Sequence, residues 1–112
     1  WTTIEAPVAL AAAIRAECRE DRVLLIDCLT LWTSNLLLAE HDIPAATAEL
    51  VAAIGDATGP LILVSNEVGL GIVPDNELAR RFRDEAGRIN QQVAAAVDEA
   101  MFIASGLPLR LK

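Results

Sequence analysis

The sequence lacks any hydrophobic run long enough to cross a bilayer, and no positively charged signal segment opens it. Because a membrane span needs about 20 consecutive apolar residues, no transmembrane helix is expected. Basic residues are also scarce, with 9 Lys and Arg against 16 Asp and Glu and a net charge of −7. Since phosphate backbones bind to basic surfaces, this balance argues against general nucleic-acid binding. We therefore expect a cytoplasmic protein without a nucleic-acid partner.

Several motifs that carry chemistry are missing as well. The two cysteines, Cys18 and Cys28, form neither a CxxC pair nor a series of metal ligands, so we expect reduced, buried thiols. The only histidine, His41, lies in the acidic turn Glu40-His41-Asp42, where a surface position without a catalytic role is expected. No GxxxxGK[ST] loop is present, so the sequence contains no standard phosphate cradle.

What the sequence does contain is enough apolar residues, 54% of 112, to form the core of a single domain spanning residues 1–112. Helical periodicity alternates with short apolar runs, which predicts an α/β fold with a mainly parallel sheet flanked by helices. The predicted strands are 22–28, 61–64, 101–104 and 107–111, the last as a short antiparallel edge strand. The predicted helices begin at Ala6-Pro7, at Leu29, at Pro44 and at about Asp75.

Polar side chains follow two of these strands where each ends. Asp27 comes directly after Val23-Leu24-Leu25-Ile26, the pattern of a Walker B strand, whose carboxylate holds Mg²⁺ near nucleotide phosphates. The alternative is that Asp27 caps the next helix, a role that Thr30 could share. Asn66 and Glu67 follow the strand 61–64, which we expect to be buried on both faces. Since ligands bind beyond the carboxyl ends of parallel strands, both strand ends are candidate sites.

The last predicted helix has two unusual features. It gathers four arginines on one face, either as surface or subunit-contact residues or as a site for a small anion: Arg80, Arg81, Arg83 and Arg88. It also contains Gly87, and a glycine inside a helix costs about 1 kcal/mol relative to alanine. We therefore expect close packing or a local break at that position.

Two long segments, LLIDCLTLWTSNLL and LVSNEVGLGIVPDNELARRFRDEAGRINQQVA, closely resemble the bifunctional adenosylcobinamide kinase/adenosylcobinamide-phosphate guanylyltransferase family of cobalamin biosynthesis. The resemblance implies a RecA-like P-loop NTPase fold and a homotrimer. It further implies that ATP or GTP phosphorylates adenosylcobinamide, and that GMP is then transferred from GTP, through a guanylylated histidine, to give adenosylcobinamide-GDP.

The resemblance also suggests roles for individual residues. Glu5, in the Trp-Thr-x-x-Glu segment, and Asp27 match family positions that bind the guanine nucleotide, and many members have Glu in place of Asp27. Asn66 and Glu67 would line the strand-end crevice, and Asp27 would lie near Mg²⁺. The family's P-loop and guanylylated histidine lie N-terminal to the segment that begins at Trp1, so we expect a C-terminal portion that is inactive in isolation.

Two other interpretations remain open from the sequence. The chain could be a fragment of a different P-loop nucleotide-binding protein, or a non-catalytic domain that keeps the fold for assembly alone. A Gly-rich GKS loop and a histidine upstream of Trp1 would support the kinase and guanylyltransferase. A P-loop without that histidine would support the first alternative. The absence of both motifs would support the second.

Overall fold

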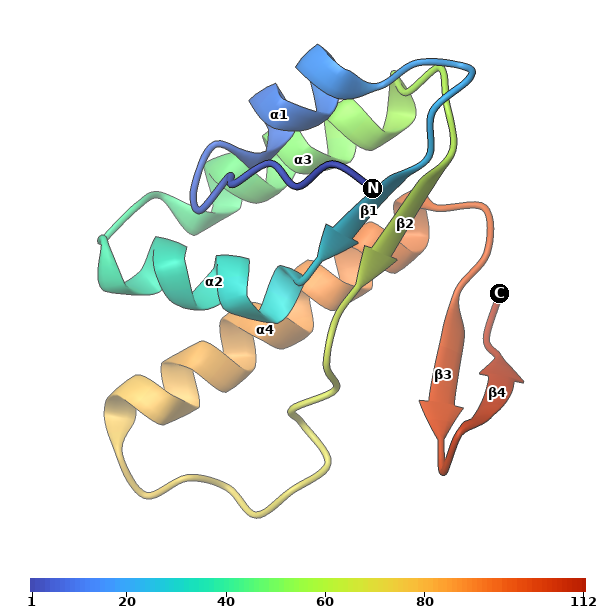
Figure 1. Cartoon of the computed structure of the whole chain (residues 1–112). Coiled ribbons are helices and arrows are strands. Elements are labelled where there is room, and N and C mark those ends of the chain that lie inside the picture. The colour runs from blue at the N-terminus through green and yellow to red at the C-terminus, as the bar shows by residue number, and fades with distance from the viewer.

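Two short parallel strands, with helices gathered on one side of them, occupy the middle of the molecule (Figure 1). The computed structural model describes all residues, 1–112. The elements follow in the order α1 (Leu10–Glu17), β1 (Leu24–Asp27), α2 (Leu29–Leu38), α3 (Ile43–Gly55), β2 (Leu61–Val64), α4 (Glu77–Ala96), β3 (Met101–Ala104) and β4 (Leu107–Arg110). None of the helices combines the length and the apolar character that a membrane crossing requires.

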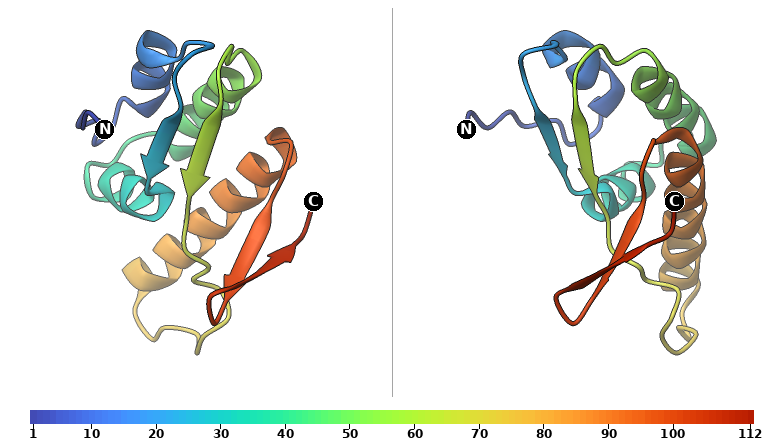
Figure 2. Two further views of the ribbon diagram at one scale, coloured as in Figure 1. Left: turned by 45° about the vertical axis from the view of Figure 1, so that its right-hand side comes forward. Right: turned by 90° about the vertical axis from the view of Figure 1, so that its right-hand side faces the viewer.

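Strands β1 and β2 pair in parallel, with Leu24 opposite Leu61 and Asp27 opposite Val64. The prediction that both faces of β2 are buried is wrong. Burial alternates along both strands, and Leu25 and Ile62 are 49% and 53% exposed. The right-hand view of Figure 2 shows the reason, since the helices lie on one side of these strands and leave the opposite face open.

The C-terminal hairpin differs from the predicted edge strand. β3 and β4 pair antiparallel, with Met101 opposite Arg110, but they form a two-stranded sheet separate from β1 and β2. The hairpin itself is predicted from the sequence, in which Gly106 separates the two strands. In the structure Gly106 adopts a φ of +74° in the turn, a conformation that glycine favours. No hydrogen bonds connect the hairpin to the parallel pair, so the expected mainly parallel sheet with an antiparallel edge consists here of two small sheets.

The hydrophobic core lies between the covered face of β1 and β2 and the four helices. Its buried members come from all four helices: Leu10, Ile14, Leu29, Trp32, Leu36, Leu37, Ile43, Leu50, Ala53, Ile89 and Val93. Leu24, Ile26, Leu61 and Leu63 of the strands pack against this cluster. Only 14 of the 112 residues are buried, so a considerable apolar surface remains open.

Helix starts are set by local capping. The Asn76 side chain accepts a hydrogen bond from Ala79 N–H at 2.7 Å, and Asp42 accepts one from Ala45 N–H at 3.1 Å. Both residues are side-chain acceptors of the type that satisfies the free N–H groups of a first turn. The first helix begins at Leu10 rather than at the predicted Ala6-Pro7. Ala9 precedes it, and no side chain caps its first turn.

Helix α4 is continuous through Gly87, contrary to the expected break or close contact. A Cβ built at Gly87 meets no atom within 4 Å. Gly87→Ala is therefore expected to raise the free energy of unfolding by about 0.5–1 kcal/mol, because alanine lowers the entropy of the unfolded chain without a steric cost. Urea denaturation of the two proteins measures the difference.

Gly59→Ala is the matched opposite case. A Cβ at Gly59 would overlap the carbonyl of Arg19, so the same substitution is expected to destabilise the protein by more than 1 kcal/mol. If Gly87→Ala lowers stability instead, then the surface around Gly87 packs against another molecule in solution.

Candidate active site

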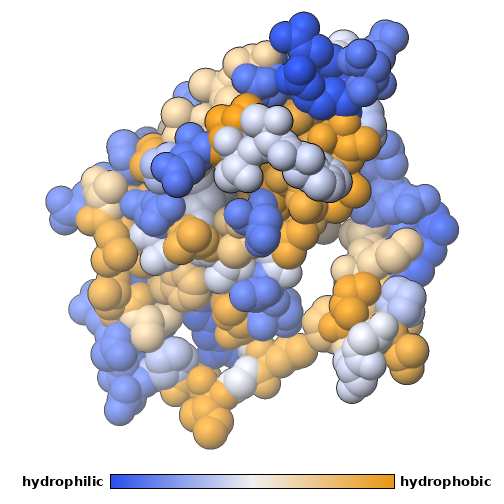
Figure 3. Space-filling model, in the orientation of Figure 1, coloured by the Kyte–Doolittle hydropathy of each residue, from blue (hydrophilic) through white to orange (hydrophobic).

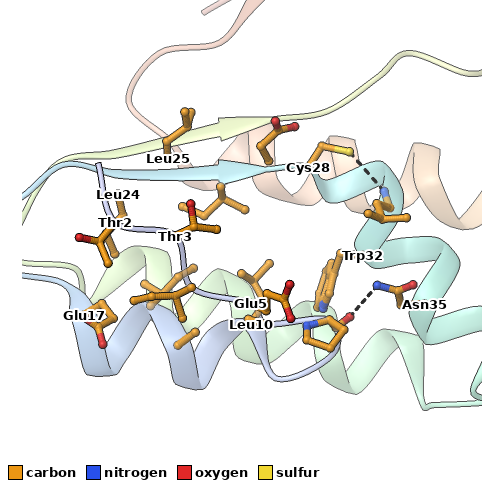
Figure 4. Close-up of a pocket in the computed structure, with 18 of the residues that line it drawn as sticks. Thr2, Thr3, Glu5, Leu10, Glu17, Leu24, Leu25, Cys28, Trp32 and Asn35 are labelled. Atoms are coloured by element: carbon orange, nitrogen blue, oxygen red, sulfur yellow. Dashed lines mark hydrogen bonds between the residues drawn. The ribbon is translucent and has the colours of Figure 1, made fainter.

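A pocket of about 650 Å³ lies between the N-terminal segment, β1 and the helices α1 and α2 (Figure 4). Its walls are mainly apolar, with Leu10, Leu24 and Trp32 among the lining residues. Two of the predicted site residues, Glu5 and Asp27, line the same pocket although 22 positions separate them in the sequence. Mostly apolar walls with a few polar groups are typical of small-molecule sites, which commonly enclose about 300–1,000 Å³.

Helix α2 holds the N-terminal segment that carries Glu5. Asn35 Nδ2 donates to the carbonyl oxygen of Pro7 at 3.0 Å, and Trp32 Nε1 donates to that of Val8 at 2.9 Å. The sequence suggested that Asn35 either supports a loop or reaches the site, and in the structure it does both, since it bonds to the segment and also lines the pocket. Because Trp32 is buried, its indole nitrogen needs this acceptor. Two hydrogen bonds thus place the segment along the pocket wall (Figure 4).

Asp27 ends β1 with an exposed carboxylate that makes no hydrogen bond and no ion pair within the chain. It does not cap α2. The residue that does is Cys28, whose sulfur accepts from Leu31 N–H at 3.4 Å. The capping alternative for Asp27 is therefore wrong, and its carboxylate oxygens are free for a ligand.

The chain could contribute only a partial metal site. No group of three or more His, Cys, Asp or Glu side chains is placed to hold an ion. Mg²⁺ is commonly bound through one or two carboxylates, with waters and substrate phosphates completing the octahedron. A single unpaired carboxylate such as that of Asp27 fits this mode, and it does not fit a site built from protein ligands alone.

The other strand end, at Asn66, is held by a hydrogen-bond network between α2, β2 and α4. Thr30 Oγ1 accepts from Asn66 N–H at 2.8 Å. Asn90 Nδ2 donates to the carbonyl oxygen of Asn66 at 3.2 Å, and Asn90 Oδ1 accepts from the Ser65 hydroxyl at 2.6 Å. The backbone of Asn66 is thus bound on both sides, whereas its side chain makes no hydrogen bond within the chain.

Glu67 shapes the loop that follows β2. Its Oε1 accepts from Gly69 N–H at 2.6 Å, and a Cβ at Gly69 would come within 2.8 Å of that oxygen. Arg83 of α4 donates to the carbonyl oxygen of Gly69 at 2.6 Å. One carboxylate oxygen of Glu67 is therefore used inside the loop, and a side chain at position 69 would require the Glu67 carboxylate to shift.

The predicted site residues fall into two neighbouring groups. Glu5 and Asp27 share the pocket, whereas Asn66 and Glu67 do not line it and lie at the end of β2. The first turn of α2 connects the groups, since Cys28 lines the pocket and Thr30 bonds to Asn66. The carboxyl ends of both strands thus meet at one edge of the sheet, as their parallel pairing requires.

His41 lies beyond the opposite end of α2, at an exposed position as the sequence predicted, and it does not line the pocket. The arginine cluster of α4 mainly serves the chain itself. Arg80 donates to the carbonyl oxygen of Pro74 at 3.0 Å, and Arg88 pairs with Glu85 at 2.9 Å. With Arg83 on Gly69, two of the four arginines hold the loop between β2 and α4.

The sequence reasoning did not identify Asn90 as a site residue or Thr30 as a partner of Asn66. Asn90 lies on the polar side of a periodic helix, 24 positions from its partner, and nothing local distinguishes it from Gln91 or Gln92. A weak signal existed for Thr30, because a hydroxyl in a first helical turn commonly bonds to nearby backbone. Its actual partner, however, lies 36 positions away.

Comparison with known proteins identifies the whole chain. Residues 1–111 match the family described as cobinamide kinase / cobinamide phosphate guanyltransferase. The bifunctional adenosylcobalamin biosynthesis protein CobP of Pseudomonas aeruginosa is 46% identical over 114 residues, covering 100% of this chain and 66% of its own length. The CobU proteins of Escherichia coli and Salmonella typhimurium, which carry the same descriptive name, are 38% and 39% identical over 127 residues. Those alignments cover 100% of this chain and 70% of each relative.

Proposed function

Because this chain belongs to the cobinamide kinase / cobinamide phosphate guanyltransferase family, we propose that it acts in cobalamin biosynthesis on adenosylcobinamide. It spans about two thirds of the length of the relatives it matches. The proposed reactions are phosphorylation of the aminopropanol hydroxyl with ATP or GTP, followed by transfer of GMP from GTP to give adenosylcobinamide-GDP. The observation that carries the proposal is the pocket that Glu5 and Asp27 share, since these are the two carboxylates expected to serve the nucleotide.

The two carboxylates have different tasks in this proposal. Glu5 contacts the guanosine part, where a carboxylate can accept from the N–H donors on the edge of a guanine base. Asp27 would hold Mg²⁺ together with the nucleotide phosphates, and the ion would supply positive charge beside the transferred phosphoryl group. Leu10, Leu24 and Trp32 would form the apolar wall beside the bound nucleotide.

The strand end at Asn66 and Glu67 forms the second part of the proposed site. The Asn66 side chain offers an amide without a partner in the chain, and Glu67 has one carboxylate oxygen left over from its bond to Gly69. Both lie beyond the carboxyl end of β2, next to that of β1. We place them along the crevice in which the substrates meet, as expected for an open α/β sheet.

We also propose a RecA-like P-loop fold and a homotrimer for the complete enzyme. The small parallel pair β1–β2 with its covering helices supports the fold. Exposed apolar side chains support association, notably Ile72 at 97% and Leu70 at 80% exposure in the loop after β2. Hydrophobic residues mark this loop at the lower edge of Figure 3 and also extend over the central strands. Light scattering at micromolar concentration gives the molecular mass that tests the trimer.

Product analysis tests the function directly. The complete enzyme, and not residues 1–112 alone, is incubated with adenosylcobinamide, Mg²⁺ and either ATP or GTP, and the corrinoids are separated by chromatography. Formation of adenosylcobinamide phosphate, and of adenosylcobinamide-GDP with GTP only, is the expected result. Nucleotide hydrolysis without a corrinoid product would favour another P-loop enzyme. The absence of both nucleotide hydrolysis and corrinoid product would favour an assembly domain.

A further inference from the structure

We propose that Thr30 and Asn90 are positioning residues that fix the strand end at Asn66 for the reaction. This inference rests on the proposed function, because it assumes that Asn66 faces the substrates. Neither residue needs to touch a ligand. Their role is to hold one short piece of backbone from two helices, so that the side chain it carries is presented in a constant direction.

The geometry at Asn66 is a clamp on both sides of one residue. Thr30, in the first turn of α2, accepts from its N–H at 2.8 Å. Asn90, in the second half of α4, donates to its carbonyl oxygen at 3.2 Å. Both polar groups of this backbone unit are therefore satisfied by side chains from different helices, and no strand partner beyond Val64 is needed to hold it.

The protons of the network have only one consistent arrangement. The Asn66 carbonyl can only accept, so Nδ2 of Asn90 faces it and Oδ1 faces Ser65. Because Oδ1 cannot donate, the Ser65 hydroxyl gives its proton to Asn90. The Thr30 hydroxyl accepts from Asn66 N–H and lies 3.5 Å from Ser65 Oγ, a long contact in which only Thr30 has a proton left to donate. In such a network each donor and acceptor has one possible direction, and connected hydrogen bonds fix the backbone more firmly than separate ones would.

The consequence concerns the one group that the network leaves free. The Asn66 side chain has no hydrogen bond within the chain, although the backbone on both sides of its Cα is fixed. Fixing this backbone sets the position of the Asn66 Cβ before the substrate arrives, so that only the side-chain torsions remain to be ordered on binding, which lowers the entropic cost of reaching the reactive geometry. Displacement of a reacting group by about 1 Å can reduce a rate by about 100-fold.

The decisive experiment uses substitutions of one shape at two threonines of α2. Thr30→Val removes the acceptor for Asn66, whereas Thr30→Ser keeps it. Thr33→Val is the matched control, because the buried Thr33 hydroxyl bonds only to the carbonyl of Leu29 in its own helix, at 2.8 Å. In the complete protein, kcat and the substrate KM are measured for the formation of each corrinoid product. The melting temperature of each variant is measured as well.

The expected result is a loss of about 10- to 100-fold in kcat/KM for Thr30→Val and near wild-type values for Thr30→Ser and Thr33→Val. If Thr30→Val does not fold, Asn90→Asp provides the same decision. It keeps the size and the acceptor for Ser65, but it sets a second carboxylate oxygen against the Asn66 carbonyl and is expected to show a similar loss.

Two negative results have different meanings. If the wild-type protein is active and Thr30→Val has the same kcat/KM as Thr33→Val, the positioning role alone is refuted. Both variants then show only the effect of a lost hydroxyl. A wild-type protein that forms neither corrinoid product refutes the proposed function, and the positioning role falls with it.

Discussion

Asp27→Asn is expected to reduce turnover of the complete enzyme by about 100-fold while leaving its melting temperature nearly unchanged. The carboxylate is exposed and makes no hydrogen bond or ion pair in the chain, so its loss removes no structural contact. Asparagine keeps the size but loses the charge that would hold Mg²⁺. Even residues that merely orient metal ligands are worth about 10- to 100-fold, so a direct ligand is expected to reach the upper end of that range.

Turnover measured across a Mg²⁺ titration checks this prediction. A metal ligand predicts that part of the loss is recovered at high Mg²⁺, because the weakened site can still be filled by mass action. Asp21→Asn is the control, since Asp21 is an exposed carboxylate in the turn before β1 and does not line the pocket. Wild-type turnover of Asp27→Asn at limiting Mg²⁺ would remove Asp27 from the site.

A polypeptide of residues 1–112 alone is expected to take up no acid-labile label from GTP, which is a complete loss of covalent transfer. Covalent guanylylation needs an activated nucleophile close to the bound nucleotide. The only histidine, His41, lies in the turn between α2 and α3 and does not line the pocket. Kinase activity is expected to be absent too, because these residues contain no GxxxxGK[ST] cradle for the phosphates.

The labelling experiment uses GTP labelled at the α-phosphate, followed by denaturing electrophoresis and acid treatment. Circular dichroism of the same sample establishes that the helices are formed, so that an absent label is not due to unfolding. His41→Ala serves as the matched variant, with no label expected in either protein. Stable label on the polypeptide that disappears in His41→Ala would contradict the placement of His41 outside the site.

Local sequence patterns were sufficient to predict the two parallel strands and most of the helices. The runs at 22–28 and 61–64 predicted β1 and β2 closely, because four consecutive apolar residues next to turn signals have few other stable conformations in an α/β chain. The helices that follow were also predicted to within a few residues, apart from α1, which begins after Pro7 rather than at it. The hydrogen-bonding and packing preferences that govern these elements act over three or four residues.

The same patterns failed where an outcome depended on distant partners. The apolar run 61–64 predicted a strand covered on both faces, but coverage depends on which elements lie against each face, and the helices all lie on one. Gly87 predicted crowding or a break, but only the tertiary structure shows that α4 leaves that position open. The hairpin sequence predicted β3 and β4 correctly and could not say that they form a sheet of their own.

By itself, then, the sequence determined the alternation of helices and strands, the position of Asp27 at a strand end, and membership of its family, because each depends on residues that are neighbours along the chain. Only the tertiary structure decided that Glu5 shares a pocket with Asp27, and that Cys28 rather than Asp27 caps α2. It also decided that Thr30 and Asn90 meet at Asn66. Hydrogen bonds across 24 and 36 positions depend on how the helices pack, and the packing is set by the whole core and not by any one segment.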